Sequence, residues 1–217
     1  MSDDFRDIDV DLPIIGQRTL KWPTADKHMH KWLHLIDQVT EVVHYCQRRQ
    51  VCVQAGGACG LWPLALSQYF DVVYTFEPHV PNFKALTANC FDAPNVIALN
   101  AALADTPGLI SIQWDKGHEA NLGAQYIGPN GQIPKMTVDP LGLPALDLLY
   151  LDIEGAEGLA INGAMESIEK YRPVVVYEDR HHHRFGFSSK EIASLFLDLG
   201  YRRVSNLSRN DDAVMVP

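Results

Sequence analysis

Short apolar runs and stretches of about ten residues with helical spacing alternate along the chain beyond Gln50. The apolar runs are VCVQA, DVVYTF, NVIALNAAL, LDLLYLDI and RPVVVYE. The helical stretches are LWPLALSQYF, VPNFKALTANC, AEGLAINGAMESIEKY and SSKEIASLFLDLG. Strands that alternate with helices favour right-handed βαβ units and a mostly parallel sheet covered on both faces. The segments YRRVSNL and AVMVP predict a final antiparallel pair, so we expect a doubly wound α/β fold.

Domain organisation follows from the length and from the N-terminal composition. A chain of 217 residues suits one domain with a short extension. Residues 1–23 are rich in Asp and lack periodicity, which predicts an extended acidic arm before a single domain over residues 24–217. Apolar residues at helical spacing over residues 24–49 predict one amphipathic helix. His30 and His34 lie one turn apart on it beside acidic residues, which favours a solvated face over a metal site.

Composition and charge narrow the class of protein. No apolar run approaches the roughly 18 residues of a membrane span, and the acidic N-terminus has no signal-peptide pattern. The four cysteines show neither a metal-binding spacing nor a disulfide framework, so we expect a cytoplasmic protein with no membrane partner. The formal net charge of −9 disfavours nucleic acid and favours a small or neutral acceptor substrate.

The segment CVQAGGACG joins the first strand of the alternating region to its first helix. Gly56, Gly57, Ala58 and Gly60 let the backbone approach a ligand at the start of that helix. The spacing fits a degraded dinucleotide fingerprint, A-x-G-x-x-G, and also the G-x-A-x-G of an S-adenosylmethionine loop. Glu77 ends the next strand about twenty residues later, where a carboxylate accepts both hydroxyls of a ribose. No tyrosine has a lysine four residues on, which removes the catalytic pair of short-chain dehydrogenases and disfavours NAD.

Five blocks together resemble one family: QAGGACG, FEPHVPNFKALTAN, TVD, DLLYLDIEGAE and PVVVYE. They are similar to the FkbM-type group of class I S-adenosylmethionine-dependent methyltransferases, from about residue 51 to the C-terminus. The resemblance implies a Rossmann-like, doubly wound, mostly parallel seven-stranded sheet with a reversed last strand. It also implies S-adenosyl-L-methionine as cofactor and O-methylation of a small-molecule, sugar or lipid-like hydroxyl.

The resemblance assigns cofactor contacts residue by residue. The residues that it implies are Gln54, Gly56, Gly57, Ala58, Gly60, Glu77, Pro78, Asn100, Ala101, Ala102 and Asp152. Residues 56–60 would line the methionine part, Glu77 would hold the ribose, residues 100–102 would flank the adenine, and Asp152 would lie near the transferable methyl group. The chain departs from the family at Gln54, where an acidic residue is common, and at Ala58, where Asn is usual. A non-catalytic Rossmann-like binding module with a drifted cofactor loop is therefore the alternative.

Acidic residues close two strands that we expect to be neighbours. Asp152 and Glu154 follow one strand, Glu178 ends the next, and His181 comes shortly after it. Methyl transfer from a sulfonium is an in-line displacement, so the protein must orient the acceptor and remove a proton from its hydroxyl. Two mechanisms are open: a carboxylate or His181 as general base, or a divalent cation held by two or three of these groups. Glu157 fits the first turn of the following helix, where acidic residues are favoured.

Two further segments leave alternatives. The three histidines at 181–183 predict a solvated loop rather than a zinc site, because consecutive side chains point in different directions. The segment KGHEANLGAQYIGPNGQ either covers the substrate, with Asn121, Gln125 and Tyr126 as polar contacts, or forms a surface hairpin that turns at residues 129–131.

Overall fold

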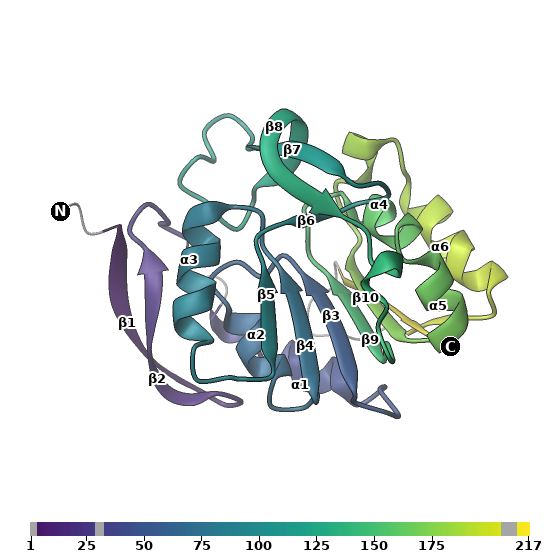
Figure 1. Ribbon diagram of the computed structural model, residues 1–217, viewed down its shortest axis with the longest axis horizontal. Coiled ribbons are helices and arrows are strands. Elements are labelled where there is room, and N and C mark those ends of the chain that lie inside the picture. The colour runs from purple at the N-terminus through teal and green to yellow at the C-terminus, as the bar shows by residue number, and fades with distance from the viewer. Residues whose placement is uncertain (1–3, 29–32, 205–211) are drawn as a thin grey trace.

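A computed structural model describes residues 4–28, 33–204 and 212–217 of the chain (Figure 1). Its centre is a seven-stranded sheet with the strand order β11-β12-β10-β9-β3-β4-β5. The strands are β3 (Val51–Ala55), β4 (Val72–Phe76), β5 (Val96–Leu99), β9 (Leu148–Leu151), β10 (Val174–Glu178), β11 (Arg202–Val204) and β12 (Asp212–Val216). β12 is antiparallel to both β10 and β11, whereas β10, β9, β3, β4 and β5 are parallel. The predicted α/β sheet with a reversed last strand is confirmed.

Helices lie on both faces of this sheet, which explains why its central strands are largely apolar. The helices are α1 (Gln38–Val43), α2 (Leu61–Leu66), α3 (Val80–Asn89), α4 (Glu157–Asn162), α5 (Met165–Tyr171) and α6 (Ser189–Asp198). Side chains of a strand alternate between faces, so Cys52 packs in one core cluster with α1 and α2. Its neighbour Val53 packs in the other cluster with α4, α5 and α6. Because both faces are largely buried, most positions of these strands are apolar, and the polar Gln54 and Thr75 bond to one another.

A second, three-stranded sheet lies beyond the carboxyl ends of β3, β4 and β5 (Figure 1). Its strands are β6 (Ala102–Leu103), β7 (Gly108–Gln113) and β8 (Tyr126–Met136), in the order β6-β8-β7. The predicted hairpin turn at residues 129–131 is wrong, because these residues lie inside β8 at a register shift opposite Ile110 and Ser111. A Cβ at Gly131 would lie 1.9 Å from the carbonyl oxygen of Ile110, so glycine permits this close crossing.

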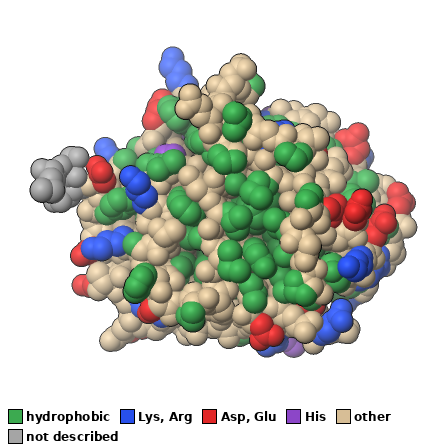
Figure 2. All heavy atoms as spheres, in the orientation of Figure 1, with side chains coloured by type: hydrophobic (Ala, Val, Ile, Leu, Met, Phe, Trp, Pro, Cys, Tyr) green, Lys and Arg blue, Asp and Glu red, His purple; other side chains and the backbone are tan. Residues whose placement is uncertain are grey.

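The chain between β5 and β9 forms these strands and the 3-10 turn η3 (Asp139–Leu141). Because this part of the chain forms no α-helix, one face of β4 and β5 is less covered by helices than the rest of the sheet. Figure 2 shows hydrophobic side chains gathered over these strands. Ile97 of β5 is 43% exposed, and its pairing partner Tyr74 on β4 is half-buried.

The N-terminal residues form a β-hairpin of β1 (Phe5–Leu12) and β2 (Gly16–Pro23), which pair antiparallel over their whole length. β2 packs against α3, where the Asn89 side chain accepts a hydrogen bond from the Lys21 N–H and donates one to the Lys21 carbonyl. The segment expected to be an extended arm is therefore anchored to the domain (Figure 1).

The single helix predicted over residues 24–49 is wrong. The described residues contain only the 3-10 turn η2 (Leu33–Leu35) and α1 in this region. The buried carboxylate of Asp26 accepts hydrogen bonds from the Trp22 indole and the His28 N–H, which turns the chain where the helix was expected to begin. Of the predicted histidine pair, His30 and the side chain of His34 lie outside the described residues.

The helix predicted over residues 156–171 is divided into α4 and α5. The break falls at Gly163, where a Cβ would lie 2.1 Å from the carbonyl oxygen of Ala104. The Gly163 carbonyl accepts hydrogen bonds from Val138 and Asp139 instead of continuing the helix. The close approach of another chain segment therefore overrides the helical pattern.

Candidate functional site

A pocket opens at the carboxyl ends of β3, β4 and β9, between the central sheet and the three-stranded sheet. Strand order reverses between β3 and β9, and ligands of doubly wound folds bind at such a switch point. The predicted site residues that line the pocket are Gln54, Gly56, Gly57, Ala58, Glu77, Pro78, Ala102, Asp152 and Glu154. The sequence therefore predicted nine residues of this pocket wall, in the glycine loop and at the ends of the strands.

The glycine loop between β3 and α2 packs directly against the end of β9. Gly56 has φ of +84°, and a Cβ there would lie 1.9 Å from the Asp152 carbonyl oxygen. A Cβ at Gly57 would lie 2.5 Å from Cδ1 of Leu86 and 2.7 Å from Oγ1 of Thr75. Glycine is therefore required at both positions, because a side chain would clash with the neighbouring segments. This close packing brings the backbone of the loop to the floor of the pocket.

Glu77 is buried at the end of β4 and is held by the glycine loop. Its Oε2 accepts a hydrogen bond from the Ala58 N–H at 2.7 Å, and its Oε1 accepts one from the His79 N–H at 2.8 Å. Burial raises the pKa of Glu77 to about 7, against hydrogen bonds from His79, Ala58 and Asn82 that favour the carboxylate. The strand end therefore presents a fixed acidic acceptor to the pocket.

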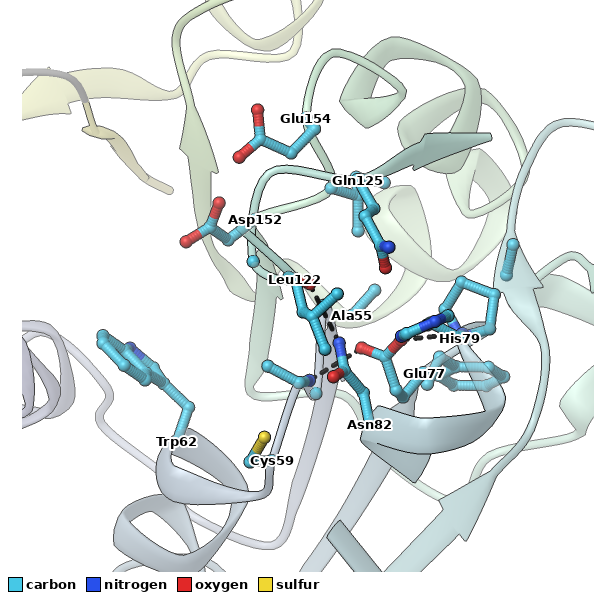
Figure 3. Close-up of a pocket in the computed structure, with 18 of the residues that line it drawn as sticks. Ala55, Cys59, Trp62, Glu77, His79, Asn82, Leu122, Gln125, Asp152 and Glu154 are labelled. Carbon is cyan, nitrogen blue, oxygen red and sulfur yellow. Dashed lines mark hydrogen bonds between the residues drawn. The ribbon is translucent and has the colours of Figure 1, made fainter. Parts of the chain in front are cut away.

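Several buried polar atoms around Glu77 have no hydrogen-bond partner among the described residues. They are Oδ1 of Asn82, Nδ1 of His79 and Oε1 of Gln125, and all three residues line the pocket. Asn82 is 2% exposed, and its Nδ2 donates to the Leu122 carbonyl at 3.0 Å (Figure 3). This end of the pocket can thus offer both acceptors and donors to a polar ligand.

Gln54 is turned into the protein at the base of the pocket. Its Oε1 accepts a hydrogen bond from the Thr75 hydroxyl at 2.5 Å, and its Nε2 donates to the Ala55 carbonyl at 3.2 Å. Ala58 has φ of +43°, a left-handed conformation that Asn tolerates better than Ala. Of the two departures from the family pattern, Ala58 therefore lies in the loop and Gln54 lies in β3 just before it, where its amide already has two partners.

Three predicted cofactor residues do not line the pocket. Asn100 donates hydrogen bonds to the carbonyls of Glu77 and Pro78, and so fixes the end of β4. Ala101 is buried in the core, and Gly60 precedes α2, where a Cβ would lie 3.1 Å from Sγ of Cys90. These three residues therefore support the pocket-lining segments without lining the pocket themselves.

The acidic residues after β9 and β10 come together as the sequence predicted. Asp152, Glu154 and Glu178 each present a carboxylate oxygen, and the three atoms lie within 4.8 Å of one another. Burial and the nearby charge of Glu178 raise the pKa of Glu154 to about 8. Glu178 pairs with Arg180 and does not line the pocket. Such a set can accept a proton, or supply the oxygen ligands that Mg²⁺ and Ca²⁺ prefer.

The three histidines after β10 differ in environment. Nε2 of His181 lies 4.0 Å from Oε2 of Glu154, outside the pocket wall, and burial together with Arg184 lowers the pKa of His181. His183 is exposed. His182 is 3% exposed and opens the 3-10 turn η4 (His182–Phe185), so the predicted solvated loop is wrong at this position.

The segment between β7 and β8 covers part of the pocket, which supports the first of the two interpretations of this region. Leu122 and Gln125 line the pocket, whereas the ring of Tyr126 lies under the Arg184 guanidinium at 4.3 Å and the buried Oδ1 of Asn121 has no partner among the described residues. Figure 3 shows Leu122 between Glu77 and the two acidic residues Asp152 and Glu154.

The sequence missed the contribution of the N-terminal segment. Trp22 and Asp26 both line the pocket and are almost fully buried. Oδ1 of Asp26 accepts a hydrogen bond from the Leu122 N–H at 3.5 Å, and the Lys27 N–H donates to the Ala120 carbonyl. No local pattern signals a contact across so many residues, so only the folded structure reveals it.

A known protein family and several solved structures resemble this chain over different parts of its length. The sequence model of the methyltransferase FkbM domain matches residues 132–203, which include Asp152, Glu154 and Glu178 but not Glu77. The crystal structure of the methyltransferase FkbM from Methylobacillus flagellatus KT aligns with a TM-score of 0.55 and 15% identity, over 88% of this chain and 54% of that chain. The chain thus spans about half of the length of that relative. No curated protein matches the sequence.

Two further solved structures align less closely. A SAM-dependent methyltransferase from Aquifex aeolicus has a TM-score of 0.48 and 11% identity, over 88% of this chain and 93% of that chain. A precorrin-6y C5,15-methyltransferase from Geobacter metallireducens GS-15 has a TM-score of 0.48 and 11% identity, over 82% of this chain and 86% of that chain.

The fold is that of the class I S-adenosylmethionine-dependent methyltransferases, with the strand order and reversed strand described above. Over residues 132–203, the domain match confirms the resemblance to the FkbM-type methyltransferases that the sequence blocks predicted. Among the described residues, no helix has the length and apolar character to cross a membrane.

Proposed function

We propose that the protein is an S-adenosylmethionine-dependent methyltransferase that methylates a hydroxyl of a small-molecule or sugar-like acceptor. The observation that carries this proposal is the placement of Glu77 and the pair of Asp152 and Glu154 on different sides of one pocket (Figure 3). The glycine loop forms the floor between them. A cofactor bound with its ribose at Glu77 would extend its methionine part along this loop toward the acidic pair.

The polar groups of the pocket fit the adenosine part of the cofactor. Glu77 offers carboxylate oxygens for ribose hydroxyls. The unpartnered atoms of Asn82, His79 and Gln125 need hydrogen-bond partners, which the hydroxyls and the ring nitrogens and amine of adenosine supply. The apolar side chains of Ile112, Leu122 and Ile127 fit a flat base.

The acidic pair fits the chemistry of a hydroxyl acceptor. When bound, S-adenosylmethionine supplies an activated methyl group for in-line displacement. Glu154 lines the pocket, and its pKa of about 8 suits a general base near neutral pH. Asp152 would orient the acceptor hydroxyl, and Glu178 keeps the pKa of Glu154 high. A divalent cation on these three carboxylates is the other arrangement, and turnover measured with and without a chelator separates the two.

The acceptor class and the location of the protein rest on general features. A net charge of −9 works against a phosphate-rich acceptor such as nucleic acid, which supports a small hydroxylated molecule. All four cysteines are buried and free, which supports action in the reducing cytoplasm.

Titration calorimetry with S-adenosylmethionine and S-adenosylhomocysteine tests the proposal without knowledge of the acceptor. We expect both ligands to bind, and Glu77→Gln to weaken binding by about tenfold to a hundredfold through the lost charge-assisted bonds. Glu169→Gln, at an exposed position on α5, is the matched control and should leave the affinity unchanged. Absence of binding to the folded protein at millimolar ligand would leave only the non-catalytic binding module.

A further inference from the structure

The loop between β9 and α4, which carries Asp152 and Glu154, has a backbone conformation that must be held in place. Glu154 has φ of +56° and Gly155 has φ of +107°. A Cβ at Gly155 would lie 2.5 Å from the carbonyl oxygen of His181, so the loop is pressed against the segment after β10. Residues in such sparsely populated conformations persist only where the surroundings determine them.

Glu157, the first residue of α4, holds this loop from inside the protein. Its Oε1 accepts hydrogen bonds from the N–H groups of Ile153 at 2.9 Å and Gly155 at 3.4 Å. Both N–H groups come before α4 in the chain, so the Glu157 carboxylate holds the loop between β9 and α4 and does not cap the helix. Glu157 is fully buried, which disfavours its charged form and raises its pKa. An ionised Glu157 therefore needs a positive partner.

His182 is placed to be that partner. Its Nδ1 lies 3.3 Å from Oε2 of Glu157, and its Nε2 lies 3.1 Å from Oδ1 of Asp179. The other oxygen of Asp179 accepts a hydrogen bond from Arg203 at 2.9 Å. A neutral imidazole carries one N–H, whereas an imidazolium carries two. Carboxylate oxygens at both ring nitrogens therefore match a doubly protonated ring.

We propose that His182 is a positioning residue: as a buried imidazolium between Asp179 and Glu157, it fixes the loop that presents Asp152 and Glu154 to the pocket. Its importance for catalysis rests on the proposed function, but the positioning itself does not. His182 lies outside the pocket wall, so it acts only through Glu157 and the loop backbone.

The electrostatics around the ring agree with this geometry. Burial alone disfavours the charged ring, but the hydrogen bond with Asp179 and the Glu157 carboxylate 3.3 Å from Nδ1 outweigh it and raise the pKa of His182 to about 9. The hydrogen bond with His182 lowers the pKa of Asp179 to about 2. The charged and titratable groups around this cluster are Asp179, Glu157, Glu178, Arg203 and the phenol of Tyr177.

Two measurements on the ligand-free protein test the proposal. In the wild type, nitrogen NMR shifts of the His182 ring should show both nitrogens protonated at about pH 8. A neutral His182 ring at that pH would overturn the proposal. This measurement needs no variant, so it decides the question even if a substitution prevents folding.

The second measurement compares His182→Gln with the matched control His183→Gln by amide hydrogen exchange. We expect the amides of Ile153 and Gly155 to exchange about tenfold faster or more in His182→Gln only. The Ala58 amide, which is bound to Glu77, should be unaffected in both variants. Equal exchange at Ile153 and Gly155 in the two variants would overturn the proposal.

Calorimetry separates this result from the proposed function. Titration of the wild type with S-adenosylhomocysteine reports cofactor binding independently of the exchange of the Ile153 and Gly155 amides. If the wild type binds no cofactor while the exchange result holds, the proposed function fails and the positioning role stands. If the wild type binds the cofactor while the exchange result fails, the proposed function stands and the positioning role of His182 fails.

Discussion

Replacement of Glu77 by Gln should change how the stability of the ligand-free protein depends on pH. Burial raises the pKa of Glu77 from 4.5 to about 7, so the folded state holds this proton more tightly than the unfolded state. The stability contributed by the protonated form is complete below about pH 4.5 and is lost as the pH rises through about 7. The shift corresponds to about 3 kcal/mol of free energy of unfolding, most of it lost between about pH 5 and pH 8.

Gln at position 77 cannot titrate, so the variant should lack this loss. Urea unfolding at about pH 5 and pH 8 gives the free energy of unfolding of both proteins. We expect the difference between wild type and Glu77→Gln to change by about 2 to 3 kcal/mol in favour of the variant as the pH rises. The variant also loses an acceptor for one of two backbone N–H groups, but this cost is the same at both pH values. The exposed control variant Glu169→Gln should show the same pH dependence as the wild type. If Glu77→Gln also follows the wild type in parallel, Glu77 does not have the raised pKa on which this prediction depends.

Three other substitutions test the site. Gly57→Ala places a Cβ 2.7 Å from the Thr75 hydroxyl, so urea unfolding should show a loss of about 1 to 3 kcal/mol, and an unchanged midpoint would count against the tight loop. Gln54→Glu removes the donor to the Ala55 carbonyl and buries a charge, so it should also destabilise the protein by about 1 to 3 kcal/mol. A stable variant with tighter cofactor binding would instead show that the side chain at position 54 contacts the cofactor. Once an acceptor is identified, Glu154→Gln should lower kcat by about a hundredfold or more without a matching change in cofactor affinity, and full activity would exclude Glu154 as the base. Under the same account, a chelator should leave turnover unchanged, and a loss restored by Mg²⁺ would favour the cation.

Much of the fold could be predicted because the buried strands carry their pattern locally. The runs that became β3, β4, β9 and β10 carry apolar residues on both faces, as expected where helices cover most of a sheet on both sides. The position of Glu77 and the acidic pair at one pocket could be predicted for a similar reason, since parallel strands bring their carboxyl ends to one edge.

The failures arose where contacts distant in sequence overrode local pattern. The helical spacing after Thr24 was real, but Asp26 is engaged by Trp22 and His28, and its bond to Leu122 depends on the complete fold. His182 was expected in a solvated loop because three consecutive side chains point in different directions and are poorly placed to share a metal ion. Only the packing of α4 against the segment after β10 buries it between two carboxylates.

A crystal structure with S-adenosylhomocysteine bound tests the central claim most directly. The account predicts ribose hydroxyls within hydrogen-bonding distance of Glu77, adenosine near Asn82 and His79, and the sulfur directed toward Asp152 and Glu154. The same structure should show Glu77 still bound to the Ala58 N–H, because a carboxylate oxygen accepts more than one hydrogen bond. A ligand bound elsewhere, or one with its ribose away from Glu77, would contradict the account.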